Sequence, residues 1–177
     1  MTKYRDYVLY SLFVGIGATL VLDLWILFSG TFLGMRGASN AILGRWFAHL
    51  ADGTFQHSTI MQAPEIANEV IIGWLGHYMV GILFAGLFLA VMGLDWVRRP
   101  TLLPALIFGI STIIAPFFLM QPSMGFGIAS SLSPDPMGAR IRNLCTHFAF
   151  GVGLYVSVTV LCQILRRRFL GRSTARA

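Results

Sequence analysis

The stretch YVLYSLFVGIGATLVLDLWILFS, residues 7–29, contains a single charged side chain, Asp23. A helix needs about 20 predominantly apolar residues to cross a bilayer, and this stretch is long enough. It is too long for the apolar region of a signal peptide and ends without a small-residue cleavage site. It therefore predicts a retained membrane-spanning helix, and it raises the question of why a carboxylate lies inside it.

Three further apolar stretches are long enough to span a membrane, over residues 66–94, 102–120 and 141–165. The chain of 177 residues is 56% hydrophobic and 11% charged, with a mean hydropathy of +0.73. Soluble domains contain about 25% charged residues, so this chain has too few polar side chains to cover a soluble globule. We therefore expect a single integral membrane domain over residues 1–177, all-α, built as a four-helix transmembrane bundle.

The basic residues indicate the orientation of this bundle, because lysine and arginine are enriched in cytoplasmic loops. If both termini are cytoplasmic, nine basic residues fall inside and four fall outside. The inner ones are Lys3, Arg5, Arg98, Arg99, Arg166, Arg167, Arg168, Arg172 and Arg176, and the outer ones are Arg36, Arg45, Arg140 and Arg142. The net charge of +6 is thus interpreted as a topology signal, and no nucleic-acid partner is expected.

The long outer loop between the first two spans contains SNAILGRWFAHLADG, residues 39–53, which has the pattern of an amphipathic helix. A serine can cap its start, and Gly53 can end it. Arg45 and His49 belong to its polar face. We expect this helix to lie on the membrane or to cover the bundle, with His49 and the loop residue His57 in solvent.

Two features concern the internal organisation of the spans. The second and fourth contain similar words, GHYMVGI at 76–82 and THFAFGV at 146–152, which indicate two helical hairpins related by a weak internal duplication. In the third span, Pro116 predicts a kink, because proline lacks an N–H and its ring displaces the carbonyl four residues earlier, that of Thr112.

The polar residues of the spans fall on faces rich in small residues. Asp23 lies on such a face of the first span, and His77 and His147 lie on such faces of the second and fourth, together with Glu69 and Asn143. Small residues let membrane helices pack closely, and a charge in the membrane interior costs about 2.5–3.5 kcal/mol. We therefore expect Asp23 to have a partner. The leading hypothesis is a layer of Asp23, His77 and His147, about 9–15 Å below the outer surface, that binds or relays a proton or small ligand. Glu69 and Asn143 are further candidates for binding that proton or ligand.

Other interpretations of this layer remain open. It can be ordinary interhelical packing in a structural subunit, whose small-residue faces bind a second copy or another membrane protein. Alternatively, His77 and His147 can be axial ligands of haem b in a redox protein, since a glycine four residues after each histidine leaves room for a flat ring. No metal centre is expected, because no closely spaced ligand pair occurs. Nothing typical of a hydrolase is found, so a non-enzymatic protein is favoured.

The two cysteines, Cys145 and Cys162, lie 17 residues apart in one apolar stretch. That separation corresponds to roughly 25 Å along a helix, whereas a disulfide requires Cα atoms within about 7 Å. We therefore expect two free thiols.

Four words distributed along the chain carry a resemblance to a known family. They are GIGATLVLDLW at 15–25, LDWVRRPTLLPAL at 94–106, PFFLMQPSMGFGIA at 116–129 and THFAFGVGLY at 146–155. With these words the chain resembles, over roughly residues 5–165, a family of bacterial integral membrane proteins catalogued as domain of unknown function 2938. The resemblance implies a multi-pass protein of the bacterial inner membrane. It implies no activity, substrate, cofactor or site residue.

Overall fold

In the computed structural model, which describes residues 2–35, 37 and 39–174, the chain is helical and contains no strand over those ranges. Four segments are long and apolar enough to cross a membrane, namely Lys3–Phe32, Glu69–Met92, Leu102–Ser123 and Pro136–Arg167. The prediction of an all-α protein with four apolar spans is thus confirmed. Arg36 and Arg176, which were counted in the charge comparison, lie outside the described residues.

The helix bounds differ from the expected ones by a few residues. The first span is helix α1 (Thr2–Phe32) and the last is α6 (Pro136–Thr174), and each begins five residues earlier than expected. The second span is α3 (Glu69–Met92), which begins three residues later than expected. The reason is that Asn68 has a left-handed backbone, with φ 61°, which a right-handed helix cannot contain.

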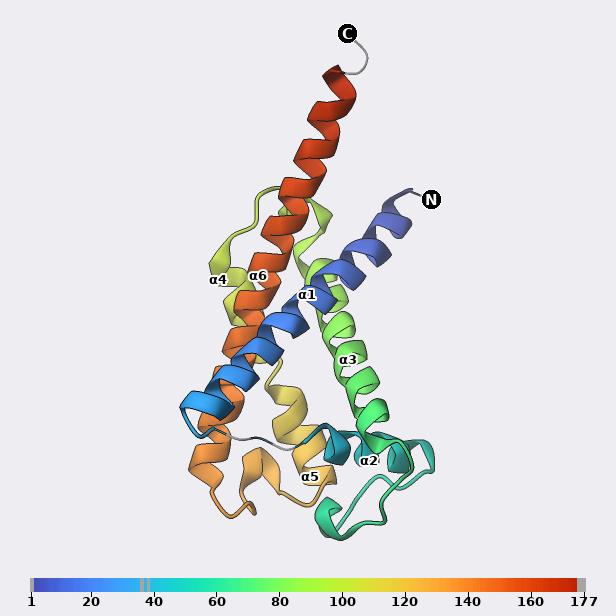
Figure 1. The fold of residues 1–177 in the computed structure, drawn as a ribbon, viewed down its shortest axis with the longest axis vertical. Coiled ribbons are helices and arrows are strands. Elements are labelled where there is room, and N and C mark those ends of the chain that lie inside the picture. The colour runs from blue at the N-terminus through green and yellow to red at the C-terminus, as the bar shows by residue number, and fades with distance from the viewer. Residues whose placement is uncertain (1, 36, 38, 175–177) are drawn as a thin grey trace.

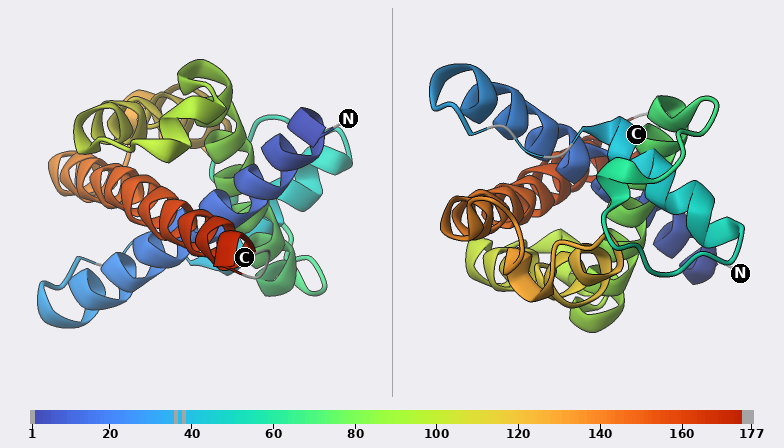
Figure 2. Two further views of the ribbon diagram at one scale, coloured as in Figure 1. Left: turned by 90° about the horizontal axis from the view of Figure 1, so that it is seen from above. Right: turned by 90° about the horizontal axis from the view of Figure 1, so that it is seen from below.

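The helices pack in the order α3, α1, α6 and α4 (Leu102–Ser111), so that α1 lies between α3 and α6. Helices α1 and α6 cross obliquely when the bundle is viewed along its length (Figure 2). Helix α1 begins and α6 ends at the same end of the bundle (Figure 1). The short helix α2 (Asn40–Ala51) packs across α3 at the opposite end.

Glycines allow the helices to approach closely. This close packing was predicted from the small residues that recur on one face of each span. A Cβ on Gly81 of α3 would overlap the Thr19 hydroxyl of α1, and one on Gly109 of α4 would overlap the backbone of Gly151 of α6. Gly81 and Gly151 each follow a histidine by four residues. The two hairpins thus use equivalent glycines at their crossings, which agrees with the internal similarity of the sequence.

The third span is interrupted, as Pro116 predicted. Helix α4 ends at Ser111, and after a turn the chain continues as a single π-helical segment, η3 (Pro116–Met120), followed by α5 (Gln121–Ser123). Because Pro116 has no N–H to donate, the regular helix cannot run through it. Thr112, the residue that follows α4, has its hydroxyl 2.7 Å from Nδ1 of His147 on α6.

The environment of helix α2 differs from the expected one in one respect. Ser39 caps it by accepting a hydrogen bond from the Ile42 N–H, and Gly53 follows its end with φ 83°, both as predicted. However, Arg45 and His49, expected on a solvated face, are buried, with 7% and 8% of their surfaces exposed. They are buried because α2 turns its polar side toward α3 and the following loop, where partners for these groups are found.

The loop after α2 is the source of one of those partners. His57 of this loop lies with its Nε2 2.8 Å from Nδ1 of His49, and its Nδ1 lies 3.1 Å from the Ser123 carbonyl oxygen. Because a carbonyl only accepts, His57 donates from Nδ1, so its Nε2 accepts a proton from His49 when both rings are neutral. The expectation that these two histidines are solvated is wrong, because they form a chain that holds the loop against α5.

Candidate functional site in the membrane-spanning bundle

Asp23 of α1 forms hydrogen bonds with two side chains of α3. Its Oδ1 lies 2.9 Å from Nε2 of His77, and its Oδ2 accepts a hydrogen bond of 2.9 Å from the Tyr78 hydroxyl. The two partners are consecutive residues of α3, so they reach the carboxylate from both sides. The expected partnership of Asp23 with His77 is therefore present in the structure.

The close approach of α1 and α3 makes this contact possible. Thr19 lies one turn before Asp23 and faces Gly81, which lies one turn after His77, so the antiparallel helices nearly touch there. Thr19 donates its own hydroxyl proton to the Gly15 carbonyl, 2.8 Å away on the same helix. It therefore requires no partner from α3. Because Gly81 lets the backbones of α1 and α3 approach closely, the side chains of Asp23 and His77, one turn away, can reach each other across the two helices.

The cluster lies well inside the span and keeps limited access to its surroundings. Asp23 is nine residues before Phe32 at the end of α1, and His77 is eight residues after Glu69 at the start of α3. These separations correspond to about 12–14 Å along the helices. The side chains of His77 and Asp23 are 19% and 20% exposed, so the pair is neither sealed in the core nor open on the surface.

The hydrogen bonds leave one nitrogen available for proton exchange. A carboxylate can only accept, so His77 donates from Nε2 and Tyr78 donates from its hydroxyl. Both oxygens of Asp23 are thus occupied. Nδ1 of His77 has no hydrogen-bond partner among the described residues, and it is not a fully buried atom. A proton can therefore be added to or removed from the pair at Nδ1 without breaking either hydrogen bond.

His147 belongs to a different hydrogen-bonded group. Its Nδ1 lies 2.7 Å from the hydroxyl of Thr112, which in turn donates to the Gly109 carbonyl at 2.6 Å. Since that hydroxyl has one proton, His147 donates from Nδ1 and its Nε2 carries the lone pair. The three residues of the expected layer thus form two groups, one between α1 and α3 and the other between α4 and α6.

The other two candidate residues have local partners. Glu69, at the start of α3, binds Arg45 of α2, and Asn143 donates to the Ala139 carbonyl of its own helix at 2.8 Å. Within the described part of the chain, no group of three or more His, Cys, Asp or Glu side chains is placed to hold a metal ion. The haem interpretation remains a prediction. Iron ligation through His77 Nε2 would break the hydrogen bond of that nitrogen to Asp23.

The ion pair at the start of α3 joins a buried arginine to a partly buried glutamate. Arg45 donates from Nε and Nη2 to the two oxygens of Glu69 at 2.9 and 3.0 Å, and from Nη1 to the Ala63 carbonyl at 3.1 Å. Glu65, which is exposed, lies 3.2 Å from Nη2. The hydrogen bonds to Glu69 raise the pKa of Arg45 above its ordinary value. This ion pair fixes α2 to the end of α3, above the Asp23 cluster.

Sequence reasoning missed several of these partners. Tyr78 could have been suspected as a hydroxyl adjacent to His77 within an apolar stretch. Thr112 was noted only as the carbonyl freed by Pro116, although its side chain is what binds His147. The partnership of Arg45 with Glu69 left no signal in the sequence, because 24 residues and a loop of irregular structure separate them.

Comparison with known proteins gives the family of the chain but no activity. Searches of curated proteins and of solved structures found no match. One family, described as "Protein of unknown function (DUF2938)", matches residues 12–161. This region includes all four apolar spans in large part, together with Asp23, His77 and Tyr78. The chain therefore belongs to the DUF2938 family, which confirms the resemblance found in its sequence.

Proposed function

We propose that this protein is a multi-pass protein of the bacterial cytoplasmic membrane that binds and passes on a proton at the Asp23–His77 pair. The observation that carries the proposal is the 2.9 Å contact between Asp23 Oδ1 and His77 Nε2, within two segments apolar enough to span a membrane. Ionisable groups inside membrane spans commonly mark proton or ion pathways. We infer no enzymatic activity.

The charge of the pair supports a proton as its ligand. With Asp23 ionised and His77 neutral, the pair carries one negative charge, and a proton added at His77 Nδ1 makes it neutral overall. The added proton thus changes the net charge of the pair by one unit. Both hydrogen bonds of Asp23 persist in either form, and Tyr78 holds the second carboxylate oxygen throughout. The pair can thus change its charge without rearranging its contacts.

The direction of access follows from the expected topology. Asp23 lies nine residues before the end of α1, and α1 runs toward the end of the bundle occupied by α2 (Figure 1). The excess of lysine and arginine near the opposite end, where α1 begins, favours a cytoplasmic location for that end. With both termini cytoplasmic, protons reach the pair from the outer side. Helix α2 and the loop after it then lie above the pair, toward the outer surface.

Proton flux into liposomes tests the proposal. The purified protein is reconstituted with a pH-sensitive dye inside, the membrane potential is clamped, and an inward proton gradient is applied. We expect faster acidification than in protein-free liposomes. Asp23→Asn and His77→Gln should reduce the rate to the passive proton leak of protein-free liposomes. Asp135→Asn, which alters an exposed carboxylate at the start of α6, serves as the matched control and should behave as wild type.

Thermal unfolding in detergent is measured on every variant, so that loss of flux is separated from loss of fold. Folded Asp23→Asn protein that carries protons at the wild-type rate would show the proposal to be wrong. If wild-type liposomes acidify no faster than empty ones while both variants are less stable, the pair is an interhelical link in a structural subunit.

A further inference from the structure

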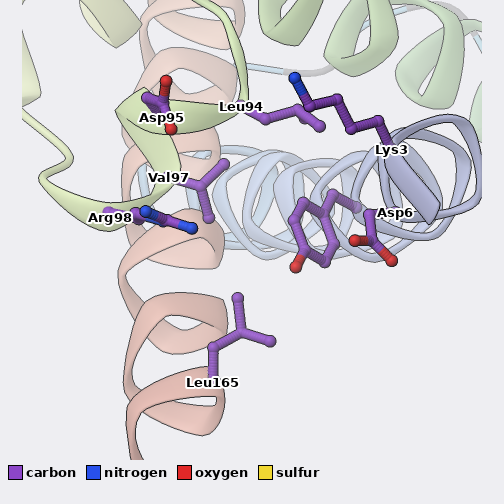
Figure 3. A pocket seen from close by; sticks show the side chains of 8 residues that line it. Lys3, Asp6, Leu94, Asp95, Val97, Arg98 and Leu165 are labelled. Atoms are coloured by element: carbon purple, nitrogen blue, oxygen red, sulfur yellow. The ribbon is translucent and has the colours of Figure 1, made fainter. Parts of the chain in front are cut away.

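A second cluster of titratable side chains lies where the loop after α2 meets α5. Nδ1 of His49 in α2 is 2.8 Å from Nε2 of His57 in the loop, and Nδ1 of His57 is 3.1 Å from the Ser123 carbonyl oxygen. The cavity of about 340 Å³ that Lys3 and Arg98 help to line (Figure 3) is a separate feature and shares no residue with this cluster. The cluster therefore has to be understood from its own contacts.

The contact between the two rings has room for one proton. Because His57 donates from Nδ1 to the Ser123 carbonyl, its Nε2 accepts a proton from His49 Nδ1 when both rings are neutral. A first added proton can bind Nε2 of His49, which has no hydrogen-bond partner among the described residues and is not a fully buried atom. The contact then persists. A second added proton has only Nε2 of His57 left, where it would face the Nδ1 proton of His49 across 2.8 Å.

The same cluster joins the loop to the bundle. The backbone N–H of His57 donates to the Ser123 carbonyl at 2.9 Å, and the N–H of Ile60 donates to the Met124 carbonyl at 2.9 Å. The ring of His57 adds its own bond to Ser123 and ties the loop to His49 of α2. Loss of the contact between the two rings would therefore free the loop from the side chain of α2 and weaken its attachment to α5.

The other charged groups around the cluster keep their charge while histidines titrate. Arg45 and Asp52 flank His49 along α2, and Glu65 lies in the chain before α3. Glu69 is the charged group that α3 turns toward His49, and η3 and α5 contribute no charged residue. Carboxylates ordinarily titrate near pH 4 and guanidinium groups above pH 12, whereas imidazole in water titrates at about pH 6.5. Imidazoles are therefore the groups whose charge changes between pH 7.5 and 5.0.

We propose that the His49–His57 pair is an acid-sensitive latch, which keeps residues 54–60 bound to α2 and α5 near neutral pH and releases them in acid. With the loop closed the pair takes up one proton, whereas with the loop open each imidazole binds a proton of its own. Opening therefore takes up one proton below about pH 6, and the opening constant rises about tenfold per pH unit. The latch is independent of proton transfer at Asp23, because no hydrogen bond joins it to the Asp23 cluster within the described residues.

Hydrogen–deuterium exchange of the full chain in detergent tests the latch at pH 7.5 and 5.0, with each rate corrected for the intrinsic effect of pH on exchange. The readout is the opening constant of amides 54–60, which include the N–H groups of His57 and Ile60. We expect it to rise about tenfold at pH 5.0, with α6 unchanged. His49→Gln should remove this rise, because an amide can donate to His57 or accept from it and does not titrate. Asp52→Asn, which alters the carboxylate that follows α2, is the matched control and should keep the rise.

Three outcomes would overturn the proposal. A wild-type change of less than about twofold would show that acid does not release the loop. The full rise in His49→Gln would show that the pair is not the group that responds to pH. An equal rise in the amides of α6 would show that acid destabilises the whole bundle rather than the loop. Because the wild-type protein alone gives the first and third results, the test stays decisive even if the His49→Gln protein does not fold.

Discussion

The contact between α2 and α3 allows a quantitative prediction about the pair Arg45–Glu69. The perturbation is the double-mutant cycle of Arg45→Met, Glu69→Gln and both together. The side chains are 8% and 15% exposed, and two hydrogen bonds of 2.9 and 3.0 Å join them. Removing one partner of a buried pair costs about 3–5 kcal/mol, because the remaining charge is left uncompensated. An exposed pair contributes only about 0–1 kcal/mol.

We expect the lower end of that range here. After Glu69→Gln, Glu65 remains 3.2 Å from Arg45 Nη2 and offsets part of the charge. After Arg45→Met, the Ile66 N–H still donates to Glu69 at 3.3 Å. Each single substitution should therefore cost about 3 kcal/mol. The double variant should cost less than the sum of the two, with a coupling energy of about 2 kcal/mol.

Hydrogen–deuterium exchange is the appropriate assay, because α2 contacts the bundle chiefly through α3 and can open without global unfolding. A loss of about 3 kcal/mol increases the opening constant more than a hundredfold. We expect this increase in amides of α2 and of the loop up to residue 63, with α6 unchanged. Arg142→Met breaks the more exposed pair of Arg142 with Asp135 and should produce no comparable change in the residues around it.

The pH dependence of this effect has a definite sign. The pKa of Arg45 is raised in the folded protein, so its contribution is complete below the unfolded-state pKa. That contribution is lost only as the pH rises through the still higher folded-state pKa. Between about pH 6 and 9 Arg45 stays cationic, and the cost of Arg45→Met should be constant.

If exchange in α2 rises less than about fivefold in both single variants, the ion pair is energetically equivalent to a surface pair, and the reasoning is refuted.

Three further substitutions have expected outcomes. Gly73→Ala should lower the melting temperature, because its methyl group would overlap the backbone of α2 at a cost of about 1–3 kcal/mol. Gly30→Ala is the control and should leave the melting temperature unchanged, because no atom lies within 4 Å of the added Cβ. Tyr78→Phe should cost about 1 kcal/mol and slow proton flux into liposomes without abolishing it; unchanged flux would show that the hydroxyl has no part in it. Thr112→Val should destabilise the protein by about 1–2 kcal/mol, because His147 loses its hydrogen-bond acceptor. Proton flux should stay at the wild-type rate. A large loss of flux would indicate that the His147–Thr112 group is coupled to the Asp23–His77 pair.

Much of the architecture was predictable because the bilayer imposes simple requirements on a sequence. An apolar stretch of sufficient length must be helical there, since every backbone polar group needs a partner within the segment. The break at Pro116 follows from a missing N–H, and the close approach at Gly81 and Gly151 follows from missing side chains. The expectation that Asp23 has a partner on another helix is likewise a local argument, because the cost of an isolated charge does not depend on the fold.

Segment by segment, the chain predicts a membrane environment, the number of apolar spans, the kink at Pro116, the separation of the two cysteines and the need for a partner at Asp23. Each of these depends on the length, composition or spacing of one segment. Which side chains meet is known only from the packing of the helices against one another. It joined Asp23 to His77 and Tyr78, gave His147 to Thr112, and turned Arg45 inward to Glu69. The rotation and crossing of packed helices set these pairings, and that geometry is a property of the whole bundle, which no single segment encodes.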